Sequence, residues 1–79
     1  MVNEVEGKLE EETEKWLERI EEEEARGKGE KANLFLKNIR AYTEDSEYFL
    51  EEGELVKAFE AVVWAWSWLE IGQELDILK

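Results

Sequence analysis

Apolar side chains recur every three or four residues along most of the chain, which is the spacing that places them on one face of an α-helix. The first such segment spans residues 2–26, where glutamate and lysine separate the apolar positions. The second spans residues 30–52, and Gly53 follows it as a residue suited to the left-handed conformation that ends many helices. The third spans residues 54–74. We therefore expect an all-α fold built from three long helices.

The glycines indicate how these helices connect. Gly53 leaves almost no room for a loop, so the second and third helices should form a tight antiparallel corner. The clearest loop is "RGKG" at residues 26–29, which separates the first helix from the second. No proline interrupts the chain, and 79 residues suit a single small domain. We predict an antiparallel three-helix bundle over residues 1–79.

The third helix is apolar around more of its circumference than two neighbouring helices can cover. At about 100° per residue, Leu55, Val62 and Leu69 share the side that should enter the core. On a flank of the same helix, small residues should let a neighbouring helix approach closely. These small residues are Ala58, Ala65 and Gly72.

A second apolar stripe lies on the far side of this helix. It consists of Trp64, Trp68, Ile71 and Leu75, and residues of the second helix that could border it are Leu34, Ala41 and Tyr48. Three alternatives remain open for this stripe. The first helix could cross it and make it core, a second copy or another protein could cover it, or a ligand could bind between the indoles. Tryptophan and tyrosine are enriched where interfaces concentrate their binding energy, so we expect protein contact.

Composition removes several functional classes. The chain has no cysteine and no histidine, which excludes disulfides, Cys/His zinc sites and thiol nucleophiles. Its net charge is −12, and its ten basic residues are scattered among 22 acidic ones, so we expect neither nucleic acid nor an anionic membrane as a partner. No signal peptide and no apolar run of about 20 residues is present, so we expect a cytoplasmic protein.

Pairs of glutamates at helical spacing are the remaining candidate chemistry. Glu18 and Glu21, or Glu44 and Glu47, are neighbours on a helix surface, and carboxylates from several helices can hold a divalent metal ion. Glu44 and Glu47 are predicted to point away from the apolar stripe of their helix, where they stay solvated. No catalytic residue, cofactor or metal ligand is therefore assigned. A small-molecule or metal-dependent enzyme that uses surface carboxylates is kept as the alternative function.

The sequence "YFLEEGELVKAFEAVVWAWSWLEIGQELDIL" resembles a family of small archaeal proteins known only as a domain of unknown function, number 357. The resemblance is clear over residues 40–78 and generic over the first helix. It implies a short three-helix bundle and an archaeal origin, and it supplies no catalytic residue. Our leading hypothesis is accordingly a protein–protein interaction module that self-associates, as a dimer, through the aromatic side of the third helix.

Overall fold

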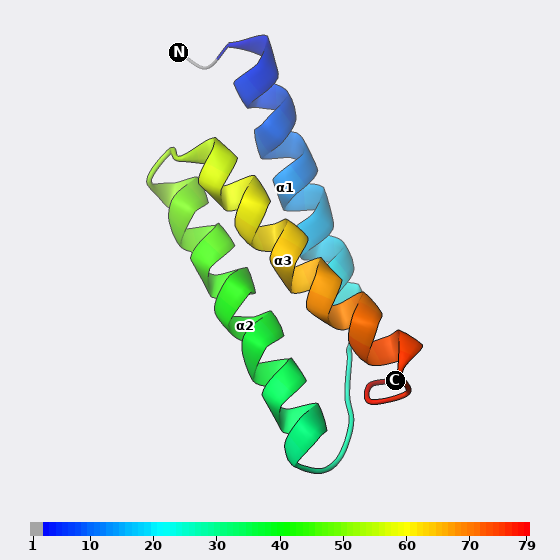
Figure 1. Ribbon diagram of the computed structural model, residues 1–79. Coiled ribbons are helices and arrows are strands. Elements are labelled where there is room, and N and C mark those ends of the chain that lie inside the picture. The colour runs from blue at the N-terminus through cyan, green and yellow to red at the C-terminus, as the bar shows by residue number, and fades with distance from the viewer. Residues whose placement is uncertain (1–2) are drawn as a thin grey trace.

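The computed structural model describes residues 3–79, and its regular structure within that range is three α-helices (Figure 1). Helix α1 spans Glu4–Glu23, α2 spans Glu30–Glu51 and α3 spans Leu55–Glu74. Packing is most extensive between α2 and α3, intermediate between α1 and α3, and slight between α1 and α2. The predicted all-α three-helix bundle is confirmed, with α3 as the helix that joins the other two.

Helix α1 begins with a capping box. The Asn3 side chain accepts a hydrogen bond from the Glu6 N–H at 2.8 Å, and the Glu6 carboxylate accepts one from the Asn3 N–H at 3.3 Å. The predicted start at residue 2 lies outside the described residues. The helix ends at Glu23, three residues before the predicted end, and Glu24 takes a left-handed conformation. Consecutive glutamates with no basic residue in the last turn oppose the negative end of the helix dipole, which favours an early end.

The predicted corner at Gly53 joins α2 to α3. Gly53 has a φ of 75°, the left-handed region in which glycine carries no steric cost. Its N–H donates to the Leu50 carbonyl at 3.1 Å, and the Glu54 N–H donates to the Phe49 carbonyl at 2.9 Å. These bonds satisfy carbonyls that the end of α2 would otherwise leave free. The corner sets α2 and α3 antiparallel (Figure 1).

Small side chains hold α3 close to α2, as predicted. Ala58 and Ala65 have no exposed area, and Gly72 is also buried. The Ser46 hydroxyl, itself fully buried, donates to the Ala58 carbonyl at 2.8 Å, which requires the two backbones to be close. The buried apolar core draws on all three helices and on the C-terminal residues. It contains Ile20, Ala32, Phe35, Ile39, Val62, Ala65, Leu69 and Leu78.

The C-terminal residues fold back against the linker between α1 and α2. Leu78 is buried against Gly72, where an added Cβ would lie 2.7 Å from the leucine side chain. Arg26 and Lys79 exchange two backbone hydrogen bonds, at 3.2 and 2.8 Å. A Cβ on Gly27 would lie 2.5 Å from the Ile77 carbonyl oxygen. The segment predicted as a plain loop is therefore a packed part of the lower end of the bundle.

Candidate interaction site

The predicted aromatic stripe is an exposed apolar surface on the outer side of α3. We call this surface the aromatic face; it comprises Trp64, Trp68, Ile71 and Leu75, and the α2 residues predicted to border it are Leu34, Ala41 and Tyr48. Trp64 is 57% exposed and Leu75 is 61% exposed, although both are large apolar side chains. Ile71 is about equally exposed, at 51%. Exposed apolar residues that gather on one surface commonly mark an interaction site.

Helix α1 does not cover this face, because it packs on another side of α3. The Trp16 ring meets the Trp66 ring edge-on, with the centroids 4.9 Å apart. Trp64 lies two positions before Trp66, and two positions turn a helix by about 200°. The Trp64 indole therefore points to the opposite side of α3, where it stacks on Tyr42 with a centroid distance of 6.0 Å and an interplanar angle of 20°. The alternative in which the first helix makes Trp64 part of the core is wrong.

Trp68 differs from Trp64 in being half-buried. Its ring meets the Phe35 ring edge-on, with centroids 4.9 Å apart and an interplanar angle of 84°. Trp68 lies about 40° around α3 from Trp64, on the side toward α2. Trp68 therefore borders the aromatic face and also packs against the core, whereas Trp64 belongs to the surface.

The α2 residues predicted to border this face are spread along the length of the helix. Leu34, Ala41 and Tyr48 are seven residues apart and all exposed, which places them on one flank. The contacts of α2 with α3 set the register of the two helices, since Tyr42 lies beside Trp64 and Phe35 beside Trp68. In this register Leu34 is level with Ile71 and Ala41 with Trp64, but each lies about 100° around α2 from Phe35 or Tyr42, the residues that meet α3. Tyr48 lies near the corner, at the level of Val56, away from the Trp64–Ile71 cluster.

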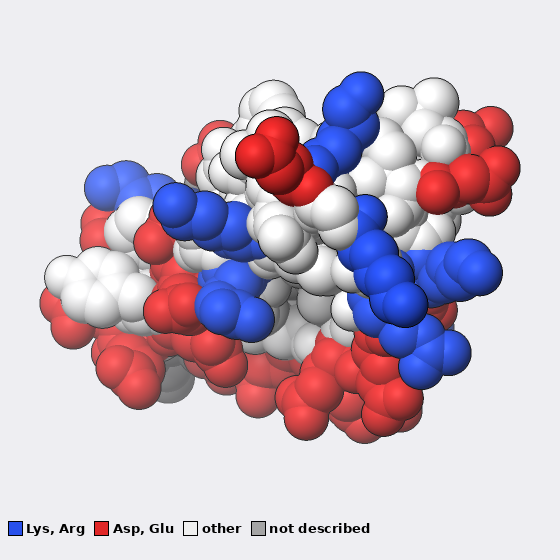
Figure 2. All heavy atoms as spheres, turned by 90° about the horizontal axis from the view of Figure 1, so that it is seen from below, with Lys and Arg blue, Asp and Glu red and all other residues white. Residues whose placement is uncertain are grey.

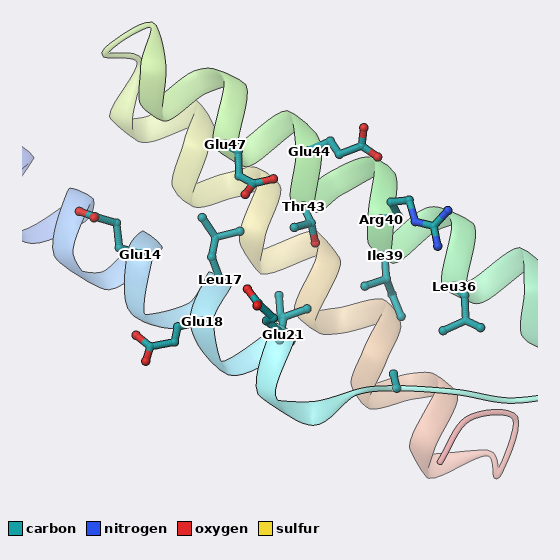
Figure 3. Close-up of a pocket in the computed structure, with 12 residues that line it drawn as sticks. Glu14, Leu17, Glu18, Glu21, Leu36, Ile39, Arg40, Thr43, Glu44 and Glu47 are labelled. Carbon is teal, nitrogen blue, oxygen red and sulfur yellow. The ribbon is translucent and has the colours of Figure 1, made fainter.

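A groove that was not predicted runs between α1 and α2, with a volume of about 830 Å³. We call it the acidic groove. Apolar side chains form its floor: Leu17, Ile20, Ala25, Leu36 and Ile39. Charged side chains form its rim: Glu14, Glu18, Glu21, Arg40, Glu44 and Glu47. Figure 3 shows Leu17 of α1 pointing toward Thr43 of α2 across this space, with α3 behind it.

The acidic groove includes the paired glutamates predicted to be solvated. Glu44 and Glu47 are exposed, as expected, and both belong to the rim of the groove, where the Glu44 side chain points away from α1 (Figure 3). Within residues 3–79, no three carboxylates come together in an arrangement that could hold a metal ion. The metal-dependent alternative therefore gains no support from the structure. The signal that could have indicated the groove is the spacing of Leu36 and Thr43, which lie seven residues apart on the side of α2 toward α1.

Charge is distributed unevenly over the molecule. Figure 2 shows the lower end, where Lys and Arg side chains project from the surface. Arg26, Lys28 and Lys79 line a hollow there with Asp76, because the C-terminal residues return to the α1–α2 linker. None of the three described helices is long and apolar enough to span a bilayer.

The fold and its exposed surfaces define a small all-α protein, a three-helix bundle with one aromatic face and one acidic groove. Residues 8–78 match a family model described as a protein of unknown function (DUF357), and the chain belongs to this family. The chain is also similar to a DUF357 protein from Archaeoglobus fulgidus whose crystal structure is known. The two are 56% identical, with a TM-score of 0.85 over 95% of this chain and 96% of the other. No curated protein matches the chain.

Proposed function

We propose that this DUF357 protein is an interaction module that self-associates through the aromatic face. The observation that carries the proposal is the exposure of Trp64, 57%, on a surface that no other part of residues 3–79 covers. Ile71 lies seven residues further along the same line, and Leu34 is level with it on α2. An exposed apolar stripe along one rigid helix suits a two-fold symmetric contact, in which the same patch meets itself.

The energetics suit a dimer of modest affinity. Fully burying a large apolar side chain contributes roughly 1.5–3 kcal/mol, so a half-exposed one has about 1 kcal/mol still to gain. Two copies each of Trp64, Ile71, Leu75 and Leu34 would contribute on the order of 8 kcal/mol. Association costs at least about 4 kcal/mol in lost translational and rotational freedom. Repulsion between two chains of net charge −12 weakens the dimer further.

Charge placement limits that repulsion. The aromatic face lies on the outer side of α3, whereas the acidic groove lies between α1 and α2. A dimer formed through the aromatic face therefore leaves the glutamates of both grooves directed away from the contact. The short distances over which charges act at physiological salt make this separation effective.

Analytical ultracentrifugation tests the proposal. We expect the wild-type chain to be monomeric at about 10 µM and partly dimeric at about 1 mM, because a net free energy of about 4 kcal/mol corresponds to a dissociation constant of about 1 mM. Replacing two anchors in Trp64→Glu/Ile71→Glu should weaken the dimer at least about 100-fold, because each substitution acts twice in a symmetric contact. Both side chains are more than half exposed, so the variant should keep its helical circular dichroism spectrum.

A matched control uses the other exposed apolar pair of α3. Val56→Glu/Val63→Glu adds the same two charges at the same spacing, about 100° around the helix from Trp64 and Ile71. This variant should dimerise nearly as well as the wild type. The proposal fails if the wild-type chain stays monomeric at about 1 mM, or if both variants weaken the dimer equally.

A further inference from the structure

The acidic groove lies where an additional helix could pack against α1 and α2. Its lining residues extend from Glu14 of α1 to Ala25, just after the end of α1, and over residues 36–47 of α2, which runs antiparallel to α1. The α2 segment spans about 17 Å at 1.5 Å per residue. Since α1 and α2 meet at few positions and α3 packs against both, the groove lies where a fourth helix would complete a four-helix bundle.

The chemistry of the groove specifies the kind of helix that fits. The floor offers the apolar side chains of Leu17, Leu36 and Ile39, so the occupant needs an apolar stripe. The rim carries three glutamates on α1 and two on α2, against Arg40 as its one basic side chain. A helix that carries Lys or Arg on both sides of its apolar stripe would place cations beside these carboxylates.

Thr43 lines the same groove and carries a buried polar atom. Its Oγ1 is buried at the side of the groove and has no hydrogen-bond partner among residues 3–79. A buried hydroxyl is normally paired, and in helices threonine often donates to the carbonyl four residues earlier, as Thr13 does to Leu9 at 2.6 Å. The Thr43 hydroxyl is thus an unpaired group of the groove wall, and its lack of exposed area keeps it from a partner side chain unless the wall moves.

A second copy of this chain does not meet these requirements. Each of its three helices carries more acidic than basic side chains, so any of them would bring carboxylates against the glutamates of the rim. A small molecule also suits the groove poorly, because its carboxylates are spread along about 17 Å of open rim instead of converging on one point. We infer that the acidic groove binds a basic amphipathic helix of a different protein, separately from self-association through the aromatic face.

A designed peptide tests this inference. The probe is a synthetic helix of about 14 residues, long enough to span the groove, with leucine along one stripe and lysine on both sides. One control peptide replaces every leucine with serine, and another replaces every lysine with glutamate. We expect the leucine–lysine peptide alone to bind the full chain, at a ratio of one to one, as measured by fluorescence anisotropy. Amide resonances of residues 14–25 and 36–47 should shift in NMR spectra.

Charge reversal on the groove rim supplies the matched variants. Glu18→Lys/Glu47→Lys changes one glutamate on each wall, and Glu10→Lys/Glu60→Lys makes the same change in net charge at exposed positions outside the groove. The first variant should weaken the peptide at least about tenfold and the second less than about threefold, because only the first places cations beside the bound lysines. Trp64→Ala should bind the peptide as the wild type does.

Several outcomes would overturn the inference. Equal weakening by the two charge-reversal variants would show that the peptide follows net charge alone. Equal binding of the serine peptide would show that the apolar floor plays no part. Peptide-induced resonance shifts confined to the aromatic face would show that the peptide does not bind in the groove. Shifts of groove residues on raising the concentration of the protein itself would show that a second copy, and not a basic helix, occupies the groove. Circular dichroism of each variant establishes that a loss of binding is not a loss of fold.

Discussion

The two flanks of α2 have the same sequence pattern but form different surfaces. On one flank Leu34 and Ala41 are exposed, and on the other Leu36 and Thr43 line the groove toward α1. Each pair is seven residues apart, so each alone predicts a helix contact. The first flank is level with Trp64 and Ile71 of α3, whereas five glutamates surround the second. The neighbours of an apolar stripe, more than the stripe itself, therefore determine which partner it favours.

The spacing between helices explains how the two flanks differ in depth. Small residues of α3 bring it directly against α2, so the aromatic face is a surface without a cleft between those helices. No comparable set of small residues draws α1 to α2. Leu17 and Leu36 are both partly buried on the core, yet they remain apart enough to leave the groove between them. A shallow apolar surface suits self-association, and an apolar groove with a charged rim suits an inserted helix.

The largest expected effect is the difference in the free energy of unfolding lost on truncating a core residue and a residue of the aromatic face. Leu69→Ala should lower the free energy of unfolding by about 3 kcal/mol, because Leu69 is fully buried and its loss leaves a cavity. Trp64→Ala should cost less than about 1 kcal/mol, since its indole is more than half exposed and stacks only on Tyr42. Urea unfolding at low protein concentration, where the chain is monomeric, measures both.

The control for this pair is Trp66→Ala. Trp66 is half-buried and packs on Trp16, so its removal should cost an intermediate amount, about 2 kcal/mol. Three equal values would contradict the comparison, because they would place Trp64 in the core with Leu69. A large loss for Trp64→Ala alone would also contradict it.

The sequence predicted those features of the fold that depend on neighbouring residues. Helical periodicity and the conformational freedom of Gly53 are local properties, so three helices and one tight corner follow from them. The direction of Trp64 relative to Val62 follows from the angle per residue. The early end of α1 at Glu23 was missed because helix propensity alone extends the glutamate run, whereas the helix dipole opposes it.

Features that depend on distance between helices could not be predicted in the same way. The angle per residue gives the direction of Trp68 but does not show that Phe35 covers half of it. The acidic groove arises from the distance between α1 and α2, and the pattern of residues along the chain does not determine this distance. Burial of Leu78 depends on the C-terminal residues reaching the linker at Gly27, a contact between distant parts of the chain. The direction of the exposed side chains on α3 was therefore accessible from sequence, whereas the acidic groove was not.

Raising the ionic strength should have opposite effects on the affinities of the two surfaces for their partners. Raising sodium chloride from about 50 mM to about 500 mM shortens the range of charge interactions several-fold. Binding of the leucine–lysine peptide should then weaken about tenfold, because attraction to the glutamate rim is screened. Self-association should strengthen about threefold, because repulsion between two acidic chains is screened while apolar contact persists.

The Glu18→Lys/Glu47→Lys variant serves as the control for this measurement. Its weakened peptide binding should depend less steeply on salt than that of the wild type, and its self-association should respond to salt as the wild type does. Anisotropy and ultracentrifugation in the same buffers supply the two sets of constants. If both processes weaken together as salt rises, the assignment of opposite physical causes to the two surfaces is incorrect.

The smallest expected effects are the changes in the free energy of unfolding on removing two hydroxyl groups of α2, which should have opposite signs. Thr43→Val should raise the free energy of unfolding by about 1 kcal/mol, because it replaces a buried, unpaired hydroxyl with a methyl group. Ser46→Ala should lower it by about 1 kcal/mol, since the Ser46 hydroxyl donates to the Ala58 carbonyl between the two helices. Urea unfolding of both variants measures the difference. If Thr43→Val destabilises the chain as Ser46→Ala does, the Thr43 hydroxyl is paired in the free protein.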